Sequence, residues 1–199
     1  MKLHKFAAIL TVLALAPSLS ACDITINLGG STTKPSAAPQ TSAPVSQPPT
    51  TGSADVLGPT GVGSLVLGMT KSEALRTGLV TGISGTQGMC GYDGDGRLAN
   101  AAPLNDDDLD GKLFFSPNTG KLVIIAATSG IATPEGIQLG SSLNDVAMAY
   151  PLWEGSEGPT EGIGIVPVAD NPRAVYRILI SDAMVTELTL QDVEQDCAE

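Results

Sequence analysis

A helix start occurs twice in this chain, as L-G-M-T-K-S-E-A-L-R-T-G over residues 67–78 and, 72 residues later, as L-G-S-S-L-N-D-V-A-M-A-Y-P over residues 139–151. In each copy a glycine stands two residues before a hydroxyl side chain, Thr70 or Ser142, that can cap the first amide groups of a helix. An acidic residue three positions later can bond back to the cap and favours the positive end of the helix dipole. Each copy therefore predicts a helix of two to three turns, which ends at the glycine or proline that closes the quoted run.

Strand signals follow each helix. The predicted strands are residues 113–115 and 121–125 around a turn at 116–120, residues 163–168, and a last hairpin of residues 174–180 and 184–190. The apolar residues of that hairpin face the same side only if its loop has an odd number of residues, and a loop of three, residues 181–183, satisfies this. It predicts Arg177 opposite Glu187 on the solvent side, with Leu179 and Val185 beside them.

These patterns predict an α+β domain. It consists of two repeated units, about 55–130 and 131–199, each a helix followed by an antiparallel hairpin. The two helices are expected to pack on one face of an antiparallel sheet.

The first helix start resembles the G-M-T-x-x-x-V-L motif of the tandem-repeat β-lactamase inhibitor proteins and of the small outer-membrane-assembly lipoproteins of SmpA/OmlA type. The resemblance covers residues 67–78 and, less closely, residues 139–151. The layout of the chain is also similar to that of a group of actinobacterial lipoproteins. The resemblance implies a repeat that binds other proteins through the surface of a sheet.

The N-terminus has the features of a lipoprotein signal peptide. A basic start precedes an apolar run at residues 6–16, which is too short to span a bilayer core of about 30 Å. L-S-A-C at residues 19–22 resembles a lipobox, and the resemblance implies that residues 1–21 are removed and that Cys22 carries acyl chains such as palmitate. The alternative is an ordinary secretory signal. Acylated Cys22 would hold the protein on the extracytoplasmic face of the cell membrane.

Residues 22–54 separate this signal from the domain at residues 55–199. They consist mainly of Ser, Thr, Pro, Ala and Gln, and such a segment cannot bury enough apolar surface to offset its ordering entropy. We expect a disordered, partly extended tether that is passive.

Composition excludes several classes of function. The chain has 10 Lys and Arg against 21 Asp and Glu, a net charge of −11, which disfavours nucleic acid as a partner. The single histidine, His4, lies in the predicted signal, so the exported protein lacks the imidazole that most hydrolases use. We therefore predict a noncatalytic protein without a cofactor. The alternative is a carboxylate-dependent enzyme of the cell envelope.

Cys90 and Cys197 are the two cysteines that remain after Cys22. An even number of cysteines in an exported protein favours a disulfide, with two free thiols or a redox pair as the alternative. The bond would close a loop of about 107 residues, worth about 4–5 kcal/mol in the chain-entropy model.

An acidic run matches the first half of a calcium loop. Asp106, Asp108 and Asp110 occupy positions 1, 3 and 5, and a glycine follows at position 6, but position 12 is Pro117 instead of the bidentate glutamate. The run is interpreted as a turn between strands, with weak calcium binding as the alternative.

The predicted function is noncatalytic binding of a protein or wall component of the envelope. Two surfaces are candidates. One is the solvent face of the last hairpin. The other is Trp153, which either packs over the end of the second helix or anchors a partner. The binding candidates are Trp153, Arg177, Leu179, Val185 and Glu187.

Overall fold

The computed structural model describes residues 56–102 and 109–197, and these residues are mainly β-structure. Strand residues make up 41% of them and helical residues 10%, in three antiparallel sheets. The predicted α+β fold of two repeated helix-plus-hairpin units is therefore wrong. The predicted signal peptide, Cys22 and the tether lie outside the described residues.

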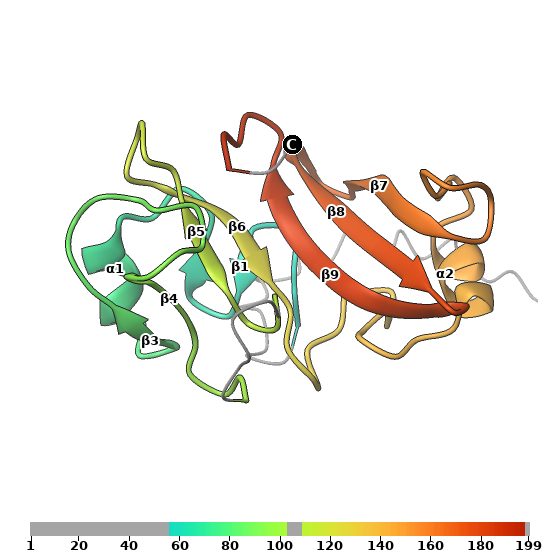
Figure 1. Cartoon of the computed structure of the whole chain (residues 1–199), viewed down its shortest axis with the longest axis horizontal. Coiled ribbons are helices and arrows are strands. Elements are labelled where there is room, and N and C mark those ends of the chain that lie inside the picture. Colours follow the sequence, from blue (N-terminus) through green and yellow to red (C-terminus); the bar gives the residue numbers. More distant parts are fainter. Residues whose placement is uncertain (1–55, 103–108, 198–199) are drawn as a thin grey trace, which may run out of the picture. The chain divides into compact units, whose positions relative to one another are not determined.

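The described residues form two small sheets and one large one (Figure 1). The small sheets are the strand pairs β1 (Gly61–Val62) with β2 (Leu65–Val66) and β3 (Val80–Ile83) with β4 (Asp95–Leu98). The large sheet has the order β5 (Leu113–Phe115), β6 (Leu122–Ala126), β9 (Met184–Asp192), β8 (Asn171–Ser181) and β7 (Gly162–Val168). The five strands of the large sheet lie where the sequence predicts strands, whereas β1 to β4 were not predicted.

The two helices are α1 (Lys71–Arg76) and α2 (Leu143–Ala149). Both begin with the predicted capping box. The side chain of Thr70 or Ser142 accepts a hydrogen bond from the backbone N–H three residues later, and the acidic side chain at that position accepts one from the backbone N–H of the cap residue. They are too short to cover a sheet face. Because α1 buries only Lys71 and Ala74, and α2 only Val146, the core is built by strands instead of by a helical layer.

The first helix start is held by a backbone junction with β6. Gly68 N–H donates to the carbonyl of Leu122 over 2.8 Å, and Leu122 N–H donates to the carbonyl of Met69 over 2.7 Å. Gly68 has a φ of 83°, a left-handed conformation that favours glycine. The start of α1 is thereby fixed beside the turn that precedes β6.

The second helix start forms the same junction with β9. Gly140 donates to Val185 over 2.8 Å, Val185 donates to Ser141 over 2.9 Å, and Gly140 has the same φ of 83° as Gly68. The repeat in the sequence thus corresponds to a repeated junction between a helix start and a strand. We call the junction at Gly68 the first junction and the junction at Gly140 the second junction. The strands around the two junctions differ.

Candidate binding surface

One face of the large sheet is partly open to solvent. In β8 every second residue from Ala174 to Ile180 is buried, and the residues between them, Val175, Arg177 and Leu179, are half-buried on the opposite side. In Figure 1 no helix crosses in front of β8 and β9. We call the side that carries these three residues the outer face.

Strand β7 extends the outer face with apolar side chains. Ile163 pairs with Leu179, and Ile165 pairs with Arg177. Ile165 is 51% exposed, the largest exposed apolar side chain of β7. The outer-face patch consists of Ile163, Ile165, Pro167, Val175, Arg177, Leu179 and Glu187. It combines apolar groups with one ion pair, a mixture typical of non-obligate protein interfaces.

The ion pair in this patch forms between residues that are not directly opposite. The Arg177 guanidinium Nη1 donates to Glu187 Oε2 over 2.7 Å. The predicted register is wrong, because Arg177 pairs with Thr189 while Glu187 pairs with Leu179. The turn has two residues, Asp182 and Ala183, both with positive φ, instead of the three predicted.

Val185 does not lie in the outer-face patch. It is buried, with 2% of its surface exposed, although the predicted register places it on the solvent side. The reason is a β-bulge. Ile180 pairs with Val185 and Leu179 pairs with Glu187, so Thr186 is an extra residue in β9 and Val185 faces the same side as Ile180. Val185 corresponds to Leu122 in the first junction, which is also buried.

Trp153 packs beneath the sheet. Its ring is 8% exposed, and Nε1 donates to the carbonyl of Ile178 over 3.4 Å. Gly164 leaves the space that the ring occupies, since a Cβ there would collide with it. Of the two alternatives that the sequence left for Trp153, packing or contact with a partner, the structure shows packing. Little of the Trp153 surface remains for a partner to contact.

The free edge of the sheet is largely blocked. β7 is the edge strand, and its Ile163 exchanges hydrogen bonds with Ser156, whose N–H donates to the Ile163 carbonyl over 2.9 Å. Two positions beyond Ile165 stands Pro167, which has no N–H to offer. Only Ile165 therefore presents both backbone groups to an added strand, which disfavours edge pairing with a partner.

Toward β6 the outer face closes. Ile124, Ala126, Thr189 and Gln191 lie on this face by register and are buried. The accessible part of the face is therefore restricted to β7, β8 and the adjoining part of β9.

The predicted disulfide between Cys90 and Cys197 is confirmed, with the two Cα atoms 4.9 Å apart. It joins the segment before β4 to the residues after β9. Next to it, the Asp196 carboxylate accepts hydrogen bonds from Ser116 Oγ over 2.8 Å and Asn118 Nδ2 over 2.6 Å. The disulfide thus holds the residues after β9 against the segment before β4, and the Asp196 hydrogen bonds hold them against the β5–β6 turn.

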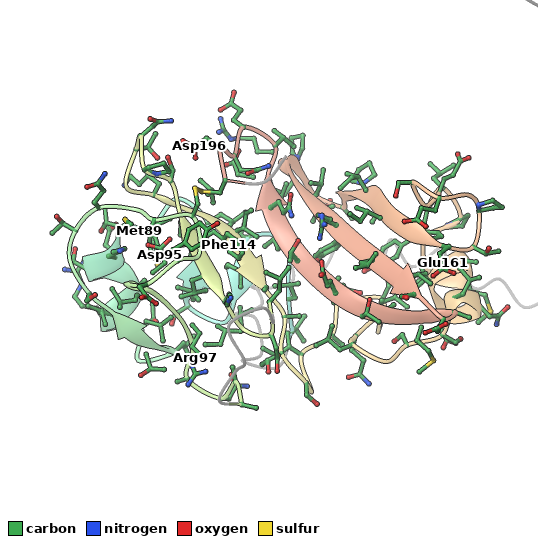
Figure 2. The ribbon with its side chains drawn as sticks, in the orientation of Figure 1. Met89, Asp95, Arg97, Phe114, Glu161 and Asp196 are labelled. Atoms are coloured by element: carbon green, nitrogen blue, oxygen red, sulfur yellow. A yellow bond between two sulfur atoms is a disulfide. The ribbon has the colours of Figure 1, made fainter. Side chains whose placement is uncertain are left out.

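A buried ion pair close to the disulfide was not predicted. The Asp95 side chain is 0% exposed, and its Oδ1 lies 2.9 Å from the Nζ of Lys71. The Asp95 carboxylate also accepts the N–H groups of Met89, Gly91 and Phe115, over 2.9–3.1 Å. Figure 2 shows Met89 and Asp95 close together at the α1 end.

Lys71 is equally well surrounded. Its Nζ donates to the carbonyls of Gly94 over 2.7 Å and Ser84 over 3.1 Å, and it lies 5.7 Å from the centre of the Phe115 ring. The pair is enclosed, with the Lys71 side chain 4% exposed and that of Asp95 0%, and its hydrogen bonds hold the loop before β4. One sequence signal was available: a lysine in the first turn opposes the helix dipole and calls for a partner.

Two carboxylates share one shallow hollow beside α2, Glu135 and Asp145. Asp145 is occupied by the Ser142 cap, and Glu135 Oε2 accepts the Tyr150 hydroxyl over 2.6 Å. Burial is the main cause that raises the pKa of Tyr150 above its usual value, so this hydroxyl stays protonated and keeps donating. Both carboxylates therefore already accept a hydrogen bond from a neighbouring side chain.

Of the calcium candidates only Asp110 is described, in the turn before β5, and Asp106 and Asp108 lie outside the described residues. Within the part of the chain that the structure describes, no three His, Cys, Asp or Glu side chains are grouped as metal ligands. No helix in that part is long and apolar enough to cross a membrane.

Comparison of the chain with known protein families, with curated proteins and with solved structures finds no match. The candidate surface therefore stands on its own geometry.

Proposed function

We propose that this protein is a lipid-anchored module on the extracytoplasmic face of the cell membrane that binds a protein or wall component of the envelope through the outer-face patch. The observation that carries the proposal is Ile165, half exposed beside the Arg177–Glu187 pair on a face that no helix crosses in Figure 1. Association would remove these apolar groups from water and keep the ion pair at the rim.

The blocked edge supports binding by the face. An added strand would find the backbone of Ile163 already bonded to Ser156 and no N–H at Pro167. A partner that packs on side chains needs none of these groups. Such a partner would also meet Leu179 and Val175, which are half-buried and therefore already held in place.

Two variants test the patch against a matched control. Ile165→Asp places a charge among the patch side chains, whereas Leu152→Asp makes the same change at a side chain that is 86% exposed after α2. Both variants should have a free energy of unfolding within about 0.5–1 kcal/mol of that of the wild type, since neither site is in the core. Cross-linking and recovery from envelope extract should then retain the partner with Leu152→Asp and lose it with Ile165→Asp.

Retention of the same partner by a folded Ile165→Asp protein would refute binding by the patch. If Ile165→Asp fails to fold, Leu179→Thr is the second variant, because threonine keeps the strand preference while it removes apolar area.

The anchor has a separate test. The proposal that Cys22 is acylated rests on the L-S-A-C run at residues 19–22. Cys22→Ala should move the protein from the membrane fraction to the soluble fraction, because two or three acyl chains anchor stably and their loss leaves none. A variant that stays in the membrane after salt and carbonate washing would exclude lipid anchoring through Cys22.

A further inference from the structure

A second surface lies beside α1, away from the outer-face patch. It is an open groove of about 630 Å³, which we call the α1 groove. Its apolar residues are Val66, Leu67 and Met69, and its basic residues are Arg76 and Lys121. The groove thus combines apolar surface with two cations in a chain whose net charge is −11.

The two cations are available to a ligand. Among the described residues neither Arg76 nor Lys121 forms an ion pair, whereas Lys71, Arg173 and Arg177 all do. The acid that lines the groove, Glu73, already accepts the N–H and O–H of Thr70, each over 2.7 Å. Glu73 therefore offsets part of the positive charge without bonding to either cation.

The α1 groove adjoins a hollow of about 320 Å³, which shares Val66 and Leu67 with it and is otherwise lined by polar and charged residues. Arg173 lies at the far side of this hollow, but its guanidinium is held by Asp192 and Glu194 at 3.5 and 2.8 Å. Among the basic residues that line the two hollows, only Arg76 and Lys121 of the α1 groove are therefore without an ion pair.

The second junction provides an internal comparison. The hollow beside α2 is lined by Ser141, Asp145, Met148 and Ala149, which follow the α1-groove residues Met69, Glu73, Arg76 and Thr77 by 72 positions. The same backbone therefore makes a hollow twice. At the second junction a methionine replaces the arginine and no Lys or Arg lines the hollow, so the cations of the α1 groove are not required by the backbone.

We propose that the α1 groove binds an extended, acidic peptide segment of a partner protein. An apolar side chain of the segment would rest on Val66, Leu67 and Met69, and its carboxylates would meet Arg76 and Lys121. A small inorganic anion would leave Val66, Leu67 and Met69 without a partner. A lipid acyl chain would need an enclosed cavity, which this open groove is not.

A fluorescein-labelled peptide, Ser-Asp-Leu-Glu-Val-Asp-Ser, is a direct probe for fluorescence polarisation with the full chain. The wild type should bind it. The affinity should fall as salt is raised from 0.05 to 0.5 M, because the Debye screening length, about 10 Å at 0.1 M, shortens with added salt. R76E combined with K121E should weaken binding by at least about tenfold. Met148→Glu, the matched change at the second junction, should leave it unchanged.

Two further peptides separate the contributions. Replacement of the acids by Asn and Gln should abolish the salt dependence and most of the binding, and replacement of Leu and Val by Ser should weaken binding at every salt concentration. A milder pair, R76Q with K121Q, should weaken binding less than the charge reversal and guards against a folding defect, which circular dichroism would detect.

The proposal is overturned by three outcomes. The first is no binding at millimolar peptide, and the second is equal binding by the wild type and by folded R76E with K121E. The third is binding of phosphatidylglycerol vesicles through Arg76 and Lys121 without binding of the peptide, which would make the groove a lipid contact. None of these depends on the outer-face patch, so the two surfaces are tested independently.

Discussion

The two junctions share their backbone and differ in almost every side chain around it. Each has a left-handed glycine, a capping box and the same pair of strand hydrogen bonds. The first helical residue is Lys71 in one and Leu143 in the other, so one junction begins on a buried ion pair and the other on an apolar contact. A repeated backbone can therefore be specified by a few residues while the surfaces beside it diverge.

The largest expected difference between the junctions comes from these first helical residues. Lys71→Ala should lower the free energy of unfolding by about 3–5 kcal/mol, because it leaves the Asp95 carboxylate buried without its cation. Leu143→Ala should cost no more than about 2 kcal/mol, because Leu143 is only partly buried. Urea denaturation measures both. Equal costs would mean that the ion pair contributes no more than an ordinary apolar contact.

The disulfide should stabilise the first junction selectively. Cys90→Ser with Cys197→Ser should cost about 2–5 kcal/mol in the free energy of unfolding. Hydrogen exchange should accelerate in β4, which follows Cys90, and in the β5–β6 turn, which bonds to Asp196 next to Cys197, and should change little around α2. Uniform acceleration across both junctions would show that the bond acts on the whole domain.

The equivalence of the backbone can be tested at the two glycines. Gly68→Ala and Gly140→Ala each force a side chain into a φ of 83°. No atom lies within 4 Å of a Cβ placed at either position, so the cost is that of the backbone alone, about 1–2 kcal/mol. The two costs should agree within about 0.5 kcal/mol. A larger difference in thermal denaturation would show that the junctions are not equivalent.

The smallest expected difference lies in the capping acids. Hydrogen bonds from the backbone and side chain of Thr70, and more weakly the charges of Lys121 and Arg76, lower the pKa of Glu73. Hydrogen bonds from Ser142 alone lower the pKa of Asp145. NMR titration of the two carboxyls should therefore show that added salt raises the pKa of Glu73 and leaves that of Asp145 nearly unchanged. An equal response would mean that the two cations do not reach Glu73.

Both acids give stability the same dependence on pH. A carboxyl whose pKa is lowered by folding stabilises the fold fully above its unfolded-state pKa, and this contribution is lost as the pH falls through the folded-state pKa. Glu73→Gln and Asp145→Asn should each make the fall in melting temperature below about pH 5 less steep. A fall that is as steep as in the wild type would contradict these caps.

The sequence predicted the features of the structure that residues close together in the chain determine. The capping boxes at Thr70 and Ser142, the turn at 116–120 and the pairing of Cys90 with Cys197 all follow from residue types at short spacing or from cysteine number. The fold class did not follow, because helices of six and seven residues bury too little to form a layer. The burial of only two residues on α1 and one on α2 is a property of the packed structure and not of a capping motif.

The outer-face patch was predicted only in part, because alternation along a strand does not reveal a bulge. Alternation along β8 placed Arg177 and Leu179 outside, as the structure does. The bulge at Thr186 placed Val185 inside, whereas Glu187 keeps the outer side that the alternation predicted. Asp95 was missed because the residues that bury it, Lys71 and Phe115, are more than 15 positions away in the chain.

Site-specific photocross-linking in the intact envelope tests binding by the outer face most directly. A photoreactive residue is introduced at position 165, and a matched one at position 152, whose side chain is 86% exposed but lies after α2. The account predicts a discrete cross-linked partner from position 165 that is absent from position 152. The same adducts from both positions, or an adduct from position 152 alone, would contradict it.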